Sequence, residues 1–365
     1  MNNNTELLVN TIISTGLNNK VKGFFKSMKI FKLARKSNIN KASGINVNKI
    51  FYEIFLAPFF NEGLSGLWKN SYIPSEFKGT GKDTFYRFLS NYSYNWRRLI
   101  NLLALKAIKL FGSLSSRQEK VLILDDTTLP KSGKHIELVS WVFDSVTKKS
   151  SLGFKNIVLG WFDGISFIPI DFTLNASSKK ANDLVKTIDG RTIGARRRQD
   201  ASKKKTDMAL EMIAKAQNSG IDASFVVFDS WFAFPVFIEA IYDIGYNVVC
   251  RLKHLPNIQY KHQGRTYTLT SLYKMVSNSM KYSPTIKGRY ASIRVSTKNG
   301  LEVKIVFCRR ENGNEWGAVL STDIDLSSEE ILRMYAKRWA IEPFFKECKQ
   351  HLNLGKEQCR NFAEI

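Results

Sequence analysis

Residues 121–126, VLILDD, are the stretch from which the fold is worked out. Four consecutive apolar residues that end in two acids are typical of a strand buried on both faces of a sheet. The chain contains two further apolar strands, ASFVVFDS (223–230) and YNVVCRL (246–252), separated by the helical pattern WFAFPVFIEAIYDIG (231–245). Strands that alternate with helices predict an α/β layer.

A β-hairpin and a helix are predicted between the first of these strands and the second. The hairpin consists of NIVLGWF (156–162) and ISFIPIDFTL (165–174), which flank Asp163-Gly164, a strong signal for a two-residue turn. The helix extends over 206–218 and is stopped by Gly220. The hairpin therefore leads into βαβ units.

The two ends of the chain show hydrophobic patterns that differ from those of the α/β layer. Helical periods over 22–36 and 84–112 indicate an α-helical start, and after residue 255 short strands alternate with polar turns. WGAVLST (316–322) then leads to a capping box at Ser327-Ser328-Glu329-Glu330, which opens a long helix over about 327–352. We expect four segments: a helical N-terminal DNA-binding domain (1–115), the first part of a catalytic core (116–254), a β-rich insertion (255–315), and the final strand and helix of the core (316–365).

The chain carries a large positive charge on a sequence that can fold. Its 365 residues include 55 Lys and Arg against 32 Asp and Glu, a net charge of +23, with 44% hydrophobic and 12% aromatic residues. This balance predicts a polyanionic partner, nucleic acid, and excludes most ordinary metabolic enzymes. No stretch approaches the roughly 18 apolar residues of a membrane span. The cysteines form no C-x-x-C pair, which fits reduced thiols in the cytoplasm.

Three acids stand where a metal ion can be held. Asp125 and Asp229 end predicted strands, and Glu342 lies in the last helix. Carboxylates without a nearby His or Cys suit hard cations such as Mg²⁺, which prefers oxygen ligands. Two such ions about 3.5–4 Å apart can activate an attacking oxygen and stabilise a leaving oxygen on phosphorus. The alternative for each Asp is a turn or helix-capping residue.

The last predicted helix carries acidic and basic side chains on one face. Tyr335, Arg338, Glu342 and Lys349 lie at i, i+3, i+7 and i+14, which keeps them within about 60° of one another. Such a face can place one metal ligand among phosphate-binding cations. Pro343 is expected to kink the helix, so this geometry is most secure up to Glu342.

These residues carry a resemblance to a known family. Tyr335-x2-Arg338-x3-Glu342-x6-Lys349 resembles the Y-R-E-K signature of the insertion-sequence-four family of DDE transposases. LDDTTL (124–129) and VVFDSWF (226–232) resemble the family's first and second acidic motifs, in the same order. The resemblance covers roughly residues 80–362.

The resemblance implies both a fold and an activity. The fold is α/β: a ribonuclease H-like mixed sheet flanked by helices, with a β-rich insertion and an α-helical N-terminal domain. Asp125, Asp229 and Glu342 are implied as catalytic ligands of Mg²⁺, for which Mn²⁺ substitutes. The implied reaction is cut-and-paste transposition, that is, strand cleavage and strand transfer at the inverted repeats of double-stranded DNA. The implied enzyme is a homodimer on DNA, cytoplasmic and associated with a bacterial nucleoid.

The spacing of the acids agrees with an insertion. The second and third acids are 342 − 229 = 113 residues apart, whereas one helix and one strand need only about 30. In this family the insertion carries a Trp that stacks on a flipped base, and Trp316 occupies the similar place. The alternative for Trp316 is a buried aromatic at the start of a strand.

The acid pair at the end of the first strand leaves one choice open. The family's first Asp commonly opens D-x-T-x-hydrophobic, and the segment 125–129, DDTTL, matches with Asp125 first. Only one of the two acids can face the site, because a strand alternates its faces. Asp125 is favoured, and Asp126 is the alternative.

Basic residues gather in a segment between the hairpin and the next helix. Residues 179–205 hold ten basic residues and three acids. We expect its two densest runs to bind DNA phosphates: Arg196, Arg197, Arg198, Lys203, Lys204 and Lys205. A solvated loop is the alternative. Further DNA contacts are expected from Tyr335, Arg338, Lys349 and Trp316.

The C-terminus leaves a second interpretation open. The chain ends 365 − 342 = 23 residues after Glu342, whereas members of the family usually continue into further helices. The alternative is a catalytically impaired, C-terminally truncated relative that acts as a non-enzymatic DNA-binding protein. A structured-RNA-binding protein is disfavoured, because no aromatic-rich RNA-binding strand motif occurs.

Overall fold

The protein is described by a computed structural model in two compact units. The described residues are 3–41, 43–60, 77, 79–111, 119–144, 147–177, 189–311, 313, 315–357, 359–362 and 365. Unit 1 comprises Met1–Leu110 and Ile188–Arg196, with Glu364. Unit 2 comprises Phe111–Thr187 and Arg197–Ala363, with Ile365.

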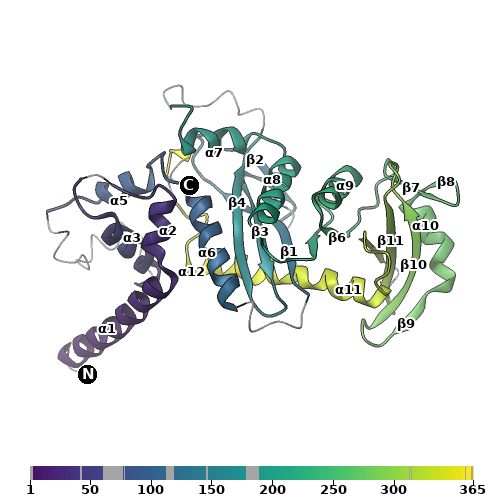
Figure 1. Ribbon diagram of the computed structural model, residues 1–365, viewed down its shortest axis with the longest axis horizontal. Helices are drawn as coiled ribbons and strands as arrows, with labels where there is room; N and C mark the ends of the chain where they lie inside the picture. The colour runs from purple at the N-terminus through teal and green to yellow at the C-terminus, as the bar shows by residue number, and fades with distance from the viewer. Residues whose placement is uncertain are drawn as a thin grey trace. The chain divides into compact units, whose positions relative to one another are not determined.

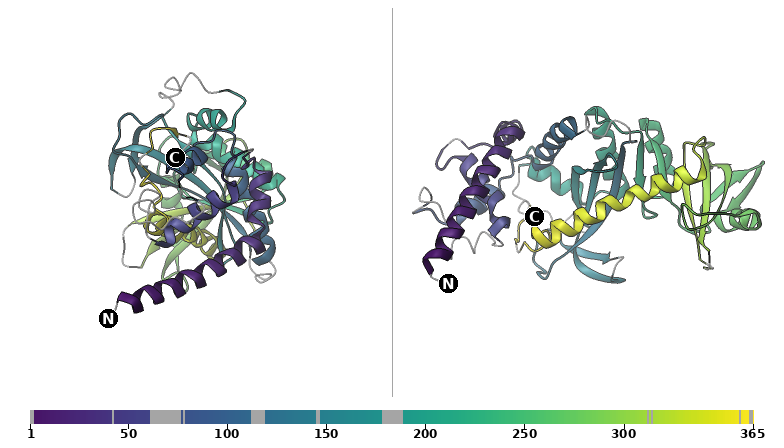
Figure 2. Two further views of the ribbon diagram at one scale, coloured as in Figure 1. Left: turned by 90° about the vertical axis from the view of Figure 1, so that its left-hand side faces the viewer. Right: turned by 90° about the horizontal axis from the view of Figure 1, so that it is seen from below.

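Helices make up unit 1, as the sequence predicts for this part of the chain. They are α1 (Asn3–Met28), α2 (Ile30–Lys36), α3 (Val47–Leu56), the 3-10 turn η1 (Ala57–Phe60), α5 (Asp83–Leu89) and α6 (Trp96–Phe111); Figure 2 shows α1 in purple. The helical pattern over 84–112 is two helices, because the polar stretch between α5 and α6 caps and turns the chain. The side chain of Asn91 accepts from Ser93 N, and that of Asn95 from Arg98 N.

A mixed sheet forms the centre of unit 2 (Figure 1). Its first strands are β1 (Val121–Pro130), β2 (Ser140–Asp144), β3 (Lys149–Phe162), β4 (Phe167–Asn175), β5 (Phe225–Phe228) and β6 (Asn247–Arg251). β3 pairs antiparallel with β1, β2 and β4, whereas β5 pairs parallel with both β1 and β6. β1 lies between β3 and β5, and its residues Val121–Leu124 are fully buried, as VLILDD predicts for a strand with both faces covered.

The segment after β6 extends the same sheet. It contains β7 (Gln259–His262), β8 (Arg265–Thr268), α10 (Leu269–Val276), the 3-10 turn η4 (Ser277–Ser279), β9 (Lys281–Ser283), β10 (Gly288–Ser296), β11 (Glu302–Arg310) and β12 (Trp316–Ser321). β12 pairs antiparallel with β6 and β11, which joins the twelve strands of the described residues into one sheet. Helix α10 is a correction to the predicted all-strand pattern. It is capped by Thr268 and is only two turns long, too short to show a helical period.

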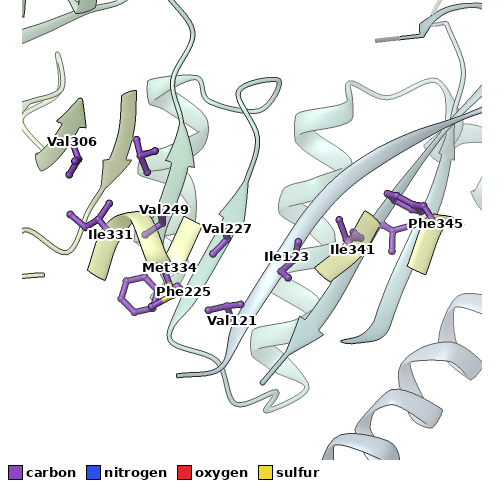
Figure 3. Packing of buried hydrophobic residues seen from close by; sticks show 12 residues of the cluster. Val121, Ile123, Phe225, Val227, Val249, Val306, Ile331, Met334, Ile341 and Phe345 are labelled. Atoms are coloured by element: carbon purple, nitrogen blue, oxygen red, sulfur yellow. The ribbon is translucent and has the colours of Figure 1, made fainter. Parts of the chain in front are cut away.

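Helices cover both faces of this sheet. Phe228 of β5 faces α9 (Pro235–Ile244), which follows α7 (Ile193–Ala201) and α8 (Lys205–Asn218) in the chain. The opposite face is covered by α11 (Ser328–Ala336), the 3-10 turn η5 (Lys337–Ala340) and α12 (Ile341–His351). Figure 3 shows their apolar side chains packed against the strands: Ile331, Met334, Ile341 and Phe345 against Val121, Ile123, Val227 and Val249. The mixed sheet flanked by helices confirms the predicted fold class.

Two predicted elements differ in detail from those observed. The hairpin of β3 and β4 is present, but Phe162 pairs with Phe167, so its loop has four residues, not two. Asp163 stabilises that loop by accepting from Ile165 N and Ser166 N. The helix over 327–352 begins with the predicted capping box at Ser327. It is not continuous, because η5 interrupts it just before Pro343, which lacks the N–H of an interior helical residue.

Two general expectations can be compared with the described part of the chain. No helix there is long and apolar enough to cross a membrane. The four cysteines, Cys250, Cys308, Cys348 and Cys359, form no disulfide.

Candidate active site

Asp125 and Asp126 lie in the middle of β1, which continues to Pro130, and not at its end as predicted, and the pair is divided between the two faces of the sheet. Asp125 lies on the face of α11 and α12, where its Oδ2 accepts from Arg338 at 2.9 Å. Asp126 lies on the other face, paired with Lys155 at 3.0 Å and with Lys205, the first residue of α8, at 2.6 Å. Strand alternation produces this division. The structure therefore brings Asp125, not Asp126, next to the helix that carries Glu342.

Arg338 joins the first predicted acid to the third. Its Nη1 donates to Asp125, and its Nη2 donates to Glu342 Oε1, also at 2.9 Å. Arg338 lies in η5 and Glu342 in the first turn of α12, so the 3-10 turn sets how the two side chains meet. The guanidinium is buried, with Tyr335 and Trp339 rings within 6 Å of it. One arginine thus holds two carboxylates from two elements.

The second predicted acid lies on the neighbouring strand. Leu124 of β1 pairs with Phe228 of β5, so Asp125 and Asp229 are the next residues on two adjacent parallel strands. Asp229 Oδ1 accepts from Trp231 N at 2.7 Å, which fixes its carboxylate as the chain leaves the sheet. Burial, reinforced by the negative charge of Asp229, raises the pKa of Asp125 to about 7, against the opposing charge of Arg338. The two aspartates repel each other unless a cation lies between them.

The donor set can be compared with the requirements of a divalent cation. Among the described residues, no three His, Cys, Asp or Glu side chains converge closely enough to form a metal cluster. A cationic group already occupies the space between Asp125 and Glu342, namely the guanidinium of Arg338. The three acids supply only carboxylate oxygens, which suit Mg²⁺. Their chemistry therefore fits such an ion, provided that Arg338 gives up one of its two carboxylates.

Lys349 reaches the same face of β1 from α12. Its Nζ donates to Thr127 Oγ1 at 2.6 Å, and Thr127 is two residues beyond Asp125, on the same side of the strand. Burial, assisted by the positive charge of Lys155, lowers the pKa of Lys349. The predicted helix face is therefore kept beyond Pro343, with Tyr335, Arg338, Glu342 and Lys349 all directed to one region.

The ring of Trp316 has no open face on which a DNA base could stack. Its ring stacks on His254, with centroids 3.9 Å apart, and on Tyr273, with centroids 4.2 Å apart. Phe307 meets its edge at 5.5 Å. Both faces of the indole are covered, so a DNA base can stack on Trp316 only if His254 or Tyr273 moves away.

This packing gives a first prediction. Trp316→Ala is expected to lower the free energy of unfolding by about 2 kcal/mol, because it removes a part-buried ring from three aromatic contacts. Thermal unfolding measures the loss, and Trp141→Ala is the matched control because Trp141 is 71% exposed. If Trp316→Ala melts at the same temperature as the wild type but loses strand cleavage, the result would instead support a DNA contact by Trp316.

A basic cavity lies next to Trp316 and Tyr335, and it was not predicted from the sequence. It has a volume of about 810 Å³ and is bounded by the insertion strands and α11. Trp316 and Tyr335 line it together with five cations: Arg251, Lys287, Arg309, Arg310 and Arg333. Among the described residues, Arg309 Nε is buried without a hydrogen-bond partner. The paired Arg309-Arg310 at the end of β11 was the available sequence signal.

The two basic runs are only partly available to DNA, which corrects the prediction for this segment. Arg198 is 2% exposed, and its guanidinium binds Glu137 and Asn361. Lys205 is held by Asp126, and Lys203 by Asp200 and Glu211. The structure leaves Arg196 and Lys204 exposed and Arg197 half-buried beside the Phe362 ring. The preceding residues 178–188 lie outside the described part of the chain.

The chain matches two known protein families. Residues 75–268, more than half of the sequence, match the family described as "DDE superfamily endonuclease". The chain belongs to the DDE superfamily endonucleases. Residues 191–360 of this DDE endonuclease also match the family described as "Archaeal putative transposase ISC1217". Asp125 lies in the first match, Glu342 in the second and Asp229 in both.

Comparisons with individual proteins add little. Among solved structures, this chain is similar to the "Drosophila P element transposase strand transfer complex", with 11% sequence identity and a TM-score of 0.28. The similarity covers 73% of this chain, which spans 56% of that one. A comparison with curated proteins finds no match. Enzymes of the DDE superfamily use divalent metal ions, generally Mg²⁺.

Proposed function

We propose that this DDE endonuclease is the transposase of an insertion sequence, of the type that carries the Y-R-E-K signature, and that it acts by cut-and-paste. The observation that carries the proposal is the arrangement around Arg338. Asp125 of β1 and Glu342 of α12 share its guanidinium, and Asp229 follows the strand adjacent to β1. Local turns and helix caps do not explain why Asp125 and Glu342, from segments far apart in the sequence, share one guanidinium.

Asp125, Asp229 and Glu342 are the proposed ligands of Mg²⁺, with Mn²⁺ as a substitute. When bound, a pair of such ions supplies Lewis acidity that activates water or a DNA 3′-hydroxyl and stabilises the leaving oxygen. Arg338 keeps Asp125 and Glu342 together before DNA binds, since its guanidinium forms an ion pair with each carboxylate. Lys349 and Tyr335 lie on the same helix face as Arg338, where they can bind and orient the phosphates that flank the cleaved bond.

The proposed partner is double-stranded DNA with transposon-end inverted repeats, bound by a homodimer. Unit 1 supports the DNA part of this proposal, because every basic residue from Lys20 to Lys49 is exposed. These residues are Lys20, Lys22, Lys26, Lys29, Lys32, Arg35, Lys36, Lys41 and Lys49. Exposed cations of this density bind phosphates without reading sequence.

Strand cleavage by the purified full chain tests the proposal. We expect nicking of a duplex that carries the ends of the element in Mg²⁺ or Mn²⁺, and no nicking after chelation by EDTA. DNA binding in EDTA should persist, because the exposed lysines do not need the metal. Binding without cleavage in either metal would reject the enzyme and favour a non-enzymatic DNA-binding relative.

A further inference from the structure

Three large aromatic side chains are exposed together at the edge of the sheet in unit 2. Trp141 and Phe143 lie on β2 and are 71% and 45% exposed, and Trp231, which follows β5, is 44% exposed. Trp141 and Phe143 project from the same face of β2, because they are two residues apart on a strand. The ring centroids of Phe143 and Trp231 are 6.5 Å apart. We call these three residues the aromatic surface.

Lysines surround the aromatic surface. Lys253 Nζ lies 3.5 Å from the centroid of the Trp231 ring, and Lys205 Nζ lies 5.6 Å from it. Lys205 and Lys155 both contact Asp126, so two cations share one carboxylate there. A cavity of about 210 Å³ is lined by Lys155, Lys205 and Asp126 and by all three residues of the aromatic surface. The local excess of positive charge complements a phosphate backbone.

The aromatic surface begins next to a proposed metal ligand. The backbone N–H of Trp231 donates to Asp229 Oδ1 at 2.7 Å, so the ring is attached directly to the turn that positions this carboxylate. Lys253 is also close enough for the charge of Asp229 to affect its pKa, although burial lowers that pKa overall. A DNA strand with a phosphate at Asp229 would have its adjacent nucleotide beside Trp231.

We propose that the aromatic surface binds unpaired bases of a single DNA strand, while Lys253 contacts its phosphates and the net positive charge of Lys155 and Lys205 with their shared partner Asp126 attracts them. The proposal rests on the proposed function, because it takes the strand to be the one cleaved at the carboxylates. Aromatic rings interleaved with cations are how proteins bind single strands without strict sequence preference. The rings of the aromatic surface are exposed, whereas both faces of the Trp316 ring are covered by His254 and Tyr273.

A protein partner is the competing occupant of exposed aromatic side chains. The lysines favour DNA, because the core of a protein interface is depleted in lysine. The adjacency of Trp231 to Asp229 also favours DNA, because the strand proposed to be cleaved would lie next to the turn that carries Trp231.

Binding of single-stranded DNA by the full chain in EDTA tests the aromatic surface without any cleavage step. The probe is a fluorescent oligothymidylate, and fluorescence anisotropy gives its affinity. Trp141→Ala is expected to weaken binding by about 5- to 150-fold, which corresponds to roughly 1–3 kcal/mol of lost stacking. Trp141→Phe should restore most of the affinity, because a ring remains. The control is Tyr242→Ala, which removes an aromatic side chain of α9 that is 44% exposed and lies outside the surface.

The dependence on salt separates stacking from charge. The slope of log affinity against log salt should be unchanged in Trp141→Ala and shallower in Lys253→Ala, because only the lysine releases counterions on binding. Oligothymidylate affinity of Trp141→Ala equal to that of the wild type would overturn the proposal. If Trp141→Ala instead dissociates a homodimer, as measured by light scattering, the aromatic surface binds protein. Failure to cleave DNA at all would reject the proposed function but leave the oligothymidylate result interpretable.

Discussion

Asp125→Asn is expected to slow metal-dependent strand cleavage by about 10³-fold or more, whereas Asp126→Asn should cleave within a few-fold of the wild type. Asparagine keeps the shape of aspartate and removes its charge, so the comparison isolates charge at two adjacent positions. Asp125 shares Arg338 with Glu342 and lies beside Asp229. Asp126 instead pairs with Lys155 and Lys205 on the other face of β1. Single-turnover nicking of an end-containing duplex in Mg²⁺ gives the rates.

Two further measurements make this comparison decisive. Asp229→Ala should be as inactive as Asp125→Asn, while both bind duplex DNA within a few-fold of the wild type, because neither removes a phosphate-binding cation. Asp126→Asn should lose stability, because it leaves two lysines without their shared carboxylate. Equal cleavage by Asp125→Asn and Asp126→Asn would show that the acid pair is structural. If only Asp126→Asn were inactive, Asp126, on the other face of β1, would be the metal ligand.

The site was predictable where local patterns determine it. VLILDD fixes a central strand, and strand alternation then separates Asp125 from Asp126. The spacing of Tyr335, Arg338 and Glu342 predicts one face for a helix of fixed period, and the contact of Arg338 with Glu342 is kept although the 3-10 turn η5 interrupts the helix. The sequence does not give the bridging position of Arg338, which depends on how α12 packs against β1. That packing comes from Ile341 and Phe345, which lie against the sheet (Figure 3).

The environment of a residue could not be predicted from the sequence where its partners lie far away along the chain. Arg198 looks like part of a basic run, and nothing nearby in the sequence indicates Glu137, 61 residues away, as its partner. Trp316 matches the expected place for a base-stacking residue, yet His254 and Tyr273 cover it. In both cases composition and spacing predict the chemistry of the residue but not its neighbours.

Arg198→Ala is expected to destabilise unit 2 by about 3–5 kcal/mol, because it leaves a buried carboxylate without its counterion. Arg198 Nε and Nη2 donate to the two oxygens of Glu137 at 2.5 and 2.8 Å, and the side chains are 3% and 6% exposed. Glu137 also accepts from Phe362 N, and Asn361 accepts from Arg198, so the pair fastens the C-terminal segment to α7. Urea unfolding measures the loss, with Arg196→Ala, an exposed neighbour, expected within about 0.5 kcal/mol of the wild type.

The same two variants decide which arginine of the run contacts DNA. Each phosphate contact contributes about 0.9 to the slope of log affinity against log salt, so Arg196→Ala should flatten the slope if that exposed side chain binds a phosphate. Arg198→Ala, measured under conditions where it stays folded, should keep the wild-type slope, because its buried guanidinium donates to Glu137 and Asn361 inside unit 2. Substituting both Arg198 and Glu137 with methionine should recover much of the stability, since the cost arises from one unpaired buried charge and not from the absence of the pair. If Arg198→Ala is as stable as the wild type and its slope of log affinity against log salt is shallower, Arg198 contacts DNA. Its contact with Glu137 would then be dispensable for folding.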